Sequence, residues 1–293
     1  MTFQKKLLFF LDLHLFLFIP LLWAQETVIH PQRIISMAPN LTEIVYDIGA
    51  GDKLVGVTDF CKFPPEAQSK EKIGGWINPN YEKILSLKPD LVLALQFHGK
   101  AVDNLRKLKV PLLVLDCQTV QDVLEAYDLL GKRLGLEKEA KAAKARLKER
   151  LDRIKDKTER FHHRPSVLFV IEHDPGSLKE IYGVGPKNFI DELIRWAGGS
   201  NLLSDAPVPY PLVSRETLIQ RNPDVIINAL PMFTKPQDLI TEKAVWKQMP
   251  VLKAVKKDQV YCFNNGDYMV PGPTLVKLAE YLSGIFQKVE AGQ

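Results

Sequence analysis

The chain has 293 residues, of which 25% are charged and 46% are hydrophobic, and its formal net charge is +4. This composition excludes a collagen-like, coiled-coil or largely disordered chain, and the small net charge argues against a nucleic-acid partner. At roughly 100–200 residues per domain, the length fits two domains that each bury a core.

Residues 1–24 have the order of a secretory signal peptide. Lys5 and Lys6 precede an apolar stretch from Leu7 to Trp23, and the small residue Ala24 stands before polar residues. We therefore expect cleavage after Ala24 and a mature chain that is exported.

An uncleaved membrane anchor is the alternative for this segment. Asp12 and His14 interrupt the apolar stretch, whereas a membrane-spanning helix needs about 20 apolar residues. Gln25 stands where a lipoprotein would carry the Cys that is acylated. The sequence thus predicts a periplasmic protein that is not a lipoprotein.

Short apolar runs alternate with amphipathic stretches of helical length over residues 32–134. The expected strands are Ile34–Met37, Leu54–Val57, Asp90–Leu95 and Pro111–Leu115, and the expected helices are Thr42–Ile48, Val102–Leu108 and Val120–Leu134. Alternation of this kind predicts an N-terminal lobe of α/β type with parallel strands.

Residues 135–160 are expected to contain one long helix. The stretch from Glu137 to Lys157 lacks Gly and Pro, and its basic residues are interleaved with acidic ones, as on a solvated helix face. Apolar residues recur at three- and four-residue steps: Leu136, Ala140, Ala143, Leu147, Leu151 and Ile154. At 1.5 Å per residue the helix would be ~32 Å long, enough to bridge two lobes. A surface helix within one lobe is the alternative.

A second set of apolar runs and helical stretches follows over residues 164–290. Its expected elements are Ser166–Ile171, Asn188–Trp196, Thr217–Arg221, Val225–Ala229 and Val260–Phe263. This pattern predicts a second α/β lobe.

The two lobes share an internal repeat. Residues 80–93 align with residues 214–227 at a constant offset, and three residue types coincide in the two copies, namely Glu82 with Glu216, Pro89 with Pro223 and Asp90 with Asp224. Each copy reads as a capped short helix, a Pro that ends it and a buried strand. Two similar lobes joined by a bridge would enclose a cleft, lined by loops at the carboxyl ends of the strands.

Aromatic residues are frequent in the loops predicted to line this cleft: Phe60, Phe63, Trp76, Phe97, Tyr182, Tyr210, Phe233 and Tyr268. Aromatic rings suit large flat ligands because they supply contact area at a small entropic cost. Core packing is the alternative and is expected to claim about half of them. Trp76, Tyr210 and Tyr268 are the strongest candidates, since none lies in a periodic apolar run.

The sequence does not indicate an enzyme or a metal site. The motifs HExxH, GxSxG, GxxxxGK[ST] and GxGxxG are missing, and Gly183–Gly185 is expected to form a tight turn. Glu172, His173 and Asp174 cannot all face one ion, because side chains alternate along a strand. An exported α/β enzyme that acts on a metal chelate is the competing hypothesis.

The three cysteines are scattered through the sequence. Cys61 and Cys117 fall in the first predicted lobe and Cys262 in the second, with no CxxC motif. We expect three free thiols, and a Cys61–Cys117 disulfide is the alternative.

Several motifs together resemble a known family. They are Arg33–Asn40 with Thr42 and Glu43, Gly49–Gly51, Leu54–Val57, Phe63–Ala67 and Leu87–Val92. They resemble the long-helix class (class III) of periplasmic substrate-binding proteins, which serve ABC importers of cobalamin, ferric siderophores and haem. The resemblance spans about residues 32–288. It implies two Rossmann-like α/β lobes bridged by one long helix, with the ligand cleft between the lobes.

Within this class the cobalamin-binding members are the most similar. The resemblance, together with the loop position of Tyr182, gives the expected ligand-binding residues Phe60, Trp76, Tyr182, Tyr210, Asp267 and Tyr268. After Tyr268 the chain has Met269 where the cobalamin binders carry an Arg nearby. The expected ligand is cobalamin or a related corrinoid, with haem or a ferric siderophore as rivals, and no resident cofactor is expected.

The resemblance also implies a partner. Members of the class dock on the transmembrane subunits of a permease through a Glu on each lobe, and the matching residues here are Glu82 and Glu216. The alternative is that both carboxylates only stabilise the N-terminus of a helix. The protein is expected to act as a monomer.

Overall fold

A computed structural model describes residues 30–230, 235–264 and 269–292. The chain divides into two compact units, residues 1–30 and residues 31–293, and the elements below all belong to the second. The predicted signal peptide lies outside the described residues. No helix within the described ranges combines the length and the apolar character needed to cross a bilayer.

The first lobe is built on a parallel sheet with the strand order β3-β2-β1-β4-β5. Its strands are β1 (Ile34–Ser36), β2 (Leu54–Val57), β3 (Glu71–Lys72), β4 (Leu91–Leu95) and β5 (Leu112–Leu115). Alternate residues face opposite sides, so Ile34 packs with α1 and Ile35 packs with α3. Helices therefore cover both faces, as a parallel sheet requires.

The helices of this lobe are α1 (Pro39–Asp47), α2 (Tyr81–Ser86), α3 (Gly99–Lys107) and α4 (Val120–Leu134), with short 3₁₀ helices η1 (Gly51–Lys53), η2 (Pro65–Ser69) and η3 (Gln96–His98). Local sequence explains where they begin and end. Thr119 and Asp122 form a capping box at the start of α4, and Gly135 ends it with φ at 70°.

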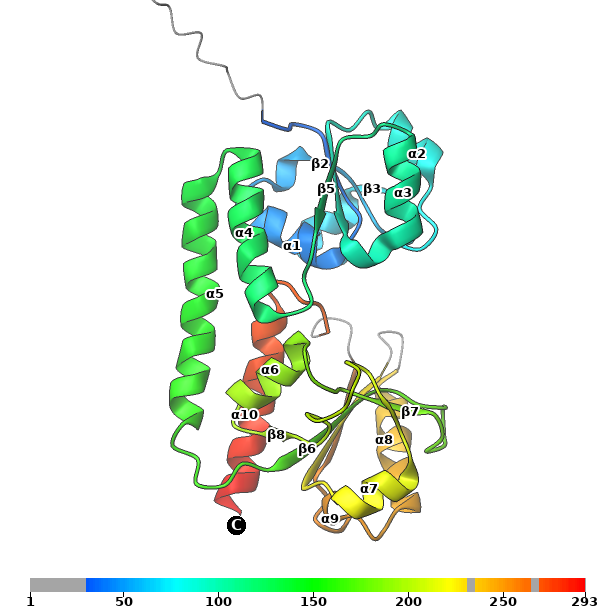
Figure 1. Cartoon of the computed structure of the whole chain (residues 1–293), viewed down its shortest axis with the longest axis vertical. Helices are drawn as coiled ribbons and strands as arrows, with labels where there is room; N and C mark the ends of the chain where they lie inside the picture. The colour runs from blue at the N-terminus through cyan, green and yellow to red at the C-terminus, as the bar shows by residue number, and fades with distance from the viewer. Residues whose placement is uncertain (1–29, 231–234, 265–268, 293) are drawn as a thin grey trace, which may run out of the picture. The chain divides into compact units, whose positions relative to one another are not determined.

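The predicted long helix is α5 (Glu137–Thr158), a helix of 22 residues. It runs beside α4 and the C-terminal helix α10 (Leu275–Ala291), as Figure 1 shows. Its buried residues are Ala140, Ala143, Leu147, Leu151, Ile154 and Thr158. The apolar stripe was therefore predicted correctly, except that Leu136 lies one position before the helix and is only partly buried.

The second lobe has a sheet with the order β11-β10-β6-β7-β9, and β8 also pairs with β6. Its parallel strands are β6 (Ser166–Glu172), β8 (Ser200–Asn201), β10 (Val225–Leu230) and β11 (Val260–Asn264). The strands β7 (Ile181–Gly183) and β9 (Leu212–Val213) are antiparallel. The apolar runs did not indicate these two because they are only three and two residues long.

The expected tight turn at Gly183–Gly185 is wrong. Gly183 ends β7, and the backbone N–H of Gly185 donates to the Pro209 carbonyl at 2.8 Å, which continues the pairing. Glycine is needed here because a Cβ on Gly185 would collide with the carbonyl oxygen of Val208.

The helices of the second lobe are α6 (Phe189–Trp196), α7 (Arg215–Arg221), α8 (Pro236–Val245), η4 (Trp246–Gln248), α9 (Lys253–Lys256) and α10. Asn188 caps α6 by accepting from the backbone N–H groups of Ile190 and Asp191. Neither α8 nor α10 was predicted, although α10 is one of the longest helices and buries nine residues.

The internal repeat is present in the structure. Asp90 accepts from the backbone N–H of Arg33 at 2.8 Å, and Asp224 accepts from that of Ser166 at 3.0 Å. Each Asp thereby fixes the start of the first strand of its own lobe. The repeated helices end alike, since Lys88 and Asn222 have φ values of 46° and 45°.

One apolar core passes through both lobes. It contains Ile34 and Leu41 from the first lobe, Leu147 from α5, and Phe169 and Phe286 from the second. Polar bonds join the lobes as well: the backbone N–H of Phe189 donates to the Gln118 carbonyl at 2.7 Å. The lobes are thus held by side-chain packing in addition to the covalent bridge.

Candidate functional site

Trp76 lies in a short closed loop of the first lobe. The loop begins at Gly74, whose φ of 85° favours glycine, and is closed by an isolated bridge between Gly74 and Pro79. The N–H of Asn80 donates to the Ile73 carbonyl at 2.8 Å. The loop follows β3, so it lies at the carboxyl edge of the sheet.

Trp76 belongs to a group of three rings in mutual contact. Its ring centroid is 5.3 Å from that of Phe97, with the planes at 86°, and 5.7 Å from that of His98, with the planes at 25°. Phe97 and His98 are 4.7 Å apart at 85°. Phe97 is 60% exposed and the neighbouring Ile77 is 64% exposed, whereas His98 is buried. This group presents apolar surface to the solvent.

Phe60 lies close to the same loop. A Cβ on Gly75 would be 3.6 Å from its ring, which is 37% exposed. Phe60, Trp76 and Phe97 follow β2, β3 and β4, so they come from the carboxyl ends of three strands of one parallel sheet. The role of these three residues in ligand binding stays a prediction. Phe63 differs, because its ring packs under the ammonium group of Lys277 at 4.6 Å.

Two further candidates, Tyr182 and Tyr210, lie in the second lobe. The expected loop position of Tyr182 is wrong, because it lies on β7 and is half-buried; Tyr210 is 44% exposed in the segment that leads to β9. The Pro209 and Pro211 carbonyls accept from Gly185 and Gly183, which fixes the backbone on both sides of Tyr210. Phe233, Asp267 and Tyr268 lie outside the described residues, so their predicted roles stay predictions.

Burial shifts the pKa of two ionisable side chains in these groups in the direction that favours the neutral form. Burial lowers the pKa of His98 to about 4, and burial raises the pKa of Tyr210 above its usual value. These side chains offer ring faces and hydrogen-bonding tips rather than an acid–base pair. This chemistry suits the binding of a large ligand with apolar faces.

In the triplet Glu172, His173 and Asp174, the histidine side chain has a structural role. His173 is buried, and its Nδ1 lies 2.9 Å from the carbonyl oxygens of both Asp174 and Ser177. Its Nε2 is 3.0 Å from the Asn228 amide and 3.5 Å from Glu242 Oε2. Across the described part of the chain, no group of three His, Cys, Asp or Glu could hold a metal ion.

The three cysteines are free in the structure. The Cys61 thiol lies 3.2 Å from the Thr42 hydroxyl and 3.1 Å from that of Thr58, inside the core. Cys117 is also buried, and Cys262 is partly buried.

Glu82 and Glu216 occupy equivalent exposed positions. Each lies in the first turn of a repeated helix, α2 or α7, behind a cap: Asn80 accepts from the N–H of Lys83, and Ser214 from that of Thr217. Hydrogen bonds from its own backbone N–H and from the Ser214 hydroxyl lower the pKa of Glu216. The exposed apolar residues Leu85 and Ile219 lie one turn further along each helix.

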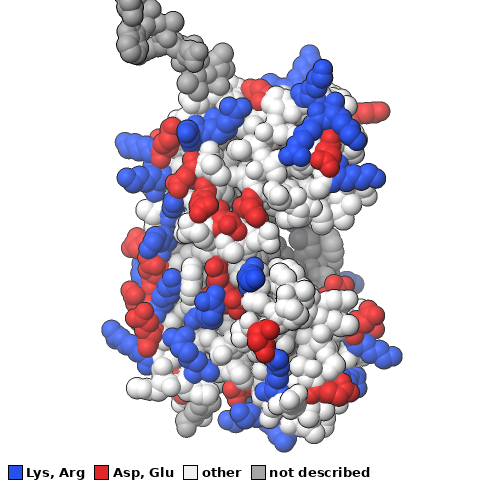
Figure 2. Space-filling view, in the orientation of Figure 1, with Lys and Arg blue, Asp and Glu red and all other residues white. Residues whose placement is uncertain are grey.

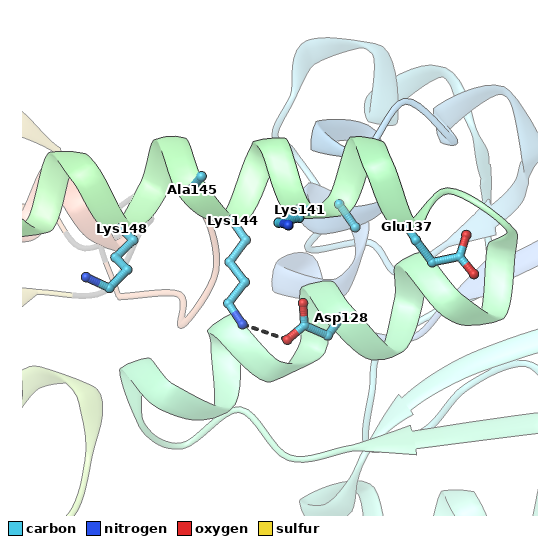
Figure 3. A pocket seen from close by; sticks show the side chains of 7 residues that line it. Asp128, Glu137, Lys141, Lys144, Ala145 and Lys148 are labelled. Atoms are coloured by element: carbon cyan, nitrogen blue, oxygen red, sulfur yellow. Dashed lines mark hydrogen bonds and ion pairs between the residues drawn. The ribbon is translucent and has the colours of Figure 1, made fainter.

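A groove of about 480 Å³ lies between α4 and α5 (Figure 3). Lys141, Lys144 and Lys148 line it together with Asp128 and Glu137, and Lys144 pairs with Asp128 at 2.6 Å. Acidic and basic side chains are mixed along this side of the molecule in Figure 2. The groove shares no residue with the aromatic group.

Known proteins are similar to this chain over most of its length. A family model described as periplasmic binding protein matches residues 34–265. The vitamin B12-binding protein of Pectobacterium carotovorum subsp. carotovorum (strain PC1) is 30% identical over 238 residues, covering 80% of this chain and 83% of the relative. An uncharacterized ABC transporter substrate-binding lipoprotein, YvrC of Bacillus subtilis (strain 168), is 32% identical over 262 residues, which are 86% of this chain and 79% of YvrC.

Among solved structures, the periplasmic vitamin B12 binding protein BtuF of Vibrio cholerae has the same architecture. The TM-score is 0.75 at 26% sequence identity, and the match covers 88% of this chain and 98% of that protein.

Proposed function

The chain belongs to the periplasmic binding protein family, whose members serve ABC importers, and we propose that it captures cobalamin or a related corrinoid and delivers it to a membrane permease. The observation that carries this proposal is the exposed aromatic group at the carboxyl ends of β2, β3 and β4. A corrin ring has broad apolar faces, which Phe60, Trp76 and Phe97 would contact.

Haem is the second candidate, and the chemistry of the described residues favours the corrinoid. Haem iron is usually held by a protein ligand such as His or Tyr. His98 is buried against Trp76, so its ring is not presented to a haem iron. A corrinoid brings its own axial ligands to cobalt and needs none from these residues.

Binding without chemical change is part of the proposal. The rival is an exported enzyme that acts on a metal chelate. The two are distinguished by recovering the ligand after long incubation with the protein, because a binding protein returns it unchanged.

Delivery requires docking on the permease, for which Glu82 and Glu216 are the proposed contacts. Their support is the repeat itself: both lobes carry an exposed carboxylate at the same step of the same helix. Equivalent sites on two lobes suit a permease with two similar subunits. The proposed location is the periplasm, after removal of residues 1–24, and the proposed state is a monomer.

The test is a titration of the mature protein with cyanocobalamin, haemin and a ferric siderophore, followed by absorbance and tryptophan emission. We expect saturable one-to-one binding of cyanocobalamin at micromolar concentration or below. Tighter binding of haemin would reassign the ligand to haem. If none of the three binds, the proposed ligand class is wrong.

A further inference from the structure

A buried histidine supports the exposed aromatic residues of the first lobe. Trp76 stacks on His98 with nearly parallel planes, and Phe97 meets both rings edge-on. His98 is 5% exposed while Phe97 is 60% exposed. His98 is therefore the internal member of the group.

The backbone of Trp76 does not determine the orientation of its side chain. Residues 75–79 form a loop without a helix or strand, tied at its ends by the Gly74–Pro79 bridge. A tryptophan in such a loop keeps one orientation only if neighbouring side chains hold its ring. His98 and Phe97 make the ring contacts that do so.

Hydrogen bonding fixes the protonation state of His98. The backbone N–H of Leu95 donates to its Nδ1 at 3.3 Å, so Nδ1 carries a lone pair and the proton is on Nε2. The residues packed against the ring, Leu95, Trp76 and Phe97, are uncharged. Desolvation lowers the pKa of His98 to about 4, so the ring is neutral at physiological pH.

We propose that His98 is a positioning residue of the ligand site, which holds Trp76 in place by stacking as a neutral ring so that Trp76 and Phe97 present one aromatic surface to a ligand. The nature of that ligand rests on the proposed function, whereas the stacking does not. A second proton, on Nδ1, would face the N–H of Leu95, and two donors repel each other. Acid would thus break the Leu95–His98 bond and release Trp76.

Stability depends on pH wherever the pKa of a group differs between the folded and the unfolded chain. The pKa of His98 in the folded protein lies below the ~6.5 of a free imidazole. As the pH falls, the unfolded chain takes up this proton before the folded protein does. The contribution of His98 to the free energy of unfolding is therefore complete above pH ~6.5 and decreases down to pH ~4. His98→Phe keeps a ring but cannot titrate, so it should remove the contribution of His98 to the dependence of the free energy of unfolding on pH.

The first experiment uses the protein without ligand. The emission that depends on Trp76 is the difference between the protein and its Trp76→Phe variant. We expect this emission to change with a midpoint near pH 4, and we expect the change to be lost in His98→Phe but kept in the exposed control His162→Ala. Far-UV circular dichroism over the same range identifies unfolding. An unchanged transition in His98→Phe would overturn the proposal.

The second experiment measures cyanocobalamin affinity at pH 7. His98→Ala should bind at least fivefold more weakly than the wild type, and His98→Phe, which keeps a ring against Trp76 but lacks the acceptor for the Leu95 N–H, should lose less affinity than His98→Ala. The double variant His98→Ala with Trp76→Ala should bind cyanocobalamin no more weakly than Trp76→Ala alone, because the effects of two coupled residues on affinity do not add. Additive losses would show that His98 does not act through Trp76.

The two proposals fail in different ways. If the wild type binds none of the tested chelates, the proposed function is wrong, and the emission experiment still decides whether His98 holds Trp76. If cyanocobalamin binds equally well to the wild type and His98→Ala, the positioning role is wrong while the proposed function stands.

Discussion

Glu43 on α1 accepts two hydrogen bonds from Thr274, from its hydroxyl at 2.8 Å and from its backbone N–H at 3.2 Å. Both residues are buried, and Thr274 directly precedes α10. The first helix of one lobe and the last helix of the chain are thus joined by a buried carboxylate.

Glu43→Ala should therefore destabilise the protein. It leaves the Thr274 N–H and hydroxyl buried without this acceptor, which costs about 1–3 kcal/mol. Urea unfolding measures the loss. The matched control is Glu280→Ala, which breaks an exposed ion pair with Arg150 and should cost less than about 1 kcal/mol. Equal losses in the two variants would contradict the role of Glu43.

Trp76→Ala should weaken cyanocobalamin binding at least tenfold. An aromatic contact contributes ~0.5–1.5 kcal/mol beyond its buried area, and tenfold corresponds to about 1.4 kcal/mol. Trp196→Ala is the control, because Trp196 packs beneath Lys155 at 3.6 Å, outside the aromatic group. Unchanged affinity in Trp76→Ala would remove this residue from the site.

Reversing two charges tests docking. Glu82→Arg with Glu216→Arg should leave cyanocobalamin affinity within about twofold but abolish receptor-stimulated ATP hydrolysis, since like charges across an interface cost several kcal/mol. Glu137→Arg with Glu139→Arg makes the same charge change in the first turn of α5 and should retain stimulation. Full stimulation by Glu82→Arg with Glu216→Arg would contradict the role of these residues in docking. A large loss of thermal stability in that variant would instead favour a role in helix capping.

All three cysteines should titrate as free thiols in denaturant. In the folded protein they should react slowly at pH 8, because burial raises the pKa of Cys117 to about 12 and that of Cys262 to about 11, and raises that of Cys61 as well. The reaction should accelerate as pH rises toward these values. A single thiol in denaturant would instead indicate a Cys61–Cys117 disulfide.

Ligand binding should close the lobes only slightly. The single helix α5 absorbs little backbone rotation, and α10 packs beside it. Solution scattering should show a change in the radius of gyration of no more than about 1 Å. A decrease of several ångströms would contradict this expectation.

The sequence predicted those elements whose local pattern is strong. The stripe from Ala140 to Ile154 set the length and the buried face of α5, and the repeated Asp90 and Asp224 marked equivalent strands. The strands β7 and β9 were missed because their pairing depends on residues distant in the chain. The helix α10 was not predicted although its buried residues recur at three- and four-residue steps from Leu275 to Val289, so its amphipathic signal was present in the sequence.

For the site, the loop position of Trp76 was sufficient to identify it as a candidate. The role of His98 was not visible, because it depends on a ring contact between residues 22 positions apart and on a hydrogen bond to Leu95. The only available signal was that Phe97 and His98 come soon after a buried strand, with Gln96 between them and its end.

The apolar core that runs from Ile34 through Leu147 to Phe286 also determines how the molecule melts. Two lobes with separate cores would unfold in two steps. Each step would then shift only in response to substitutions in its own lobe. Each lobe also has a core cluster of its own, around Ile35 or around Trp246, but we expect the shared core to couple the unfolding of the two lobes into one transition. A cavity in one lobe, as in Phe286→Ala, would then lower one calorimetric transition for the whole protein, including the distant aromatic group around Trp76.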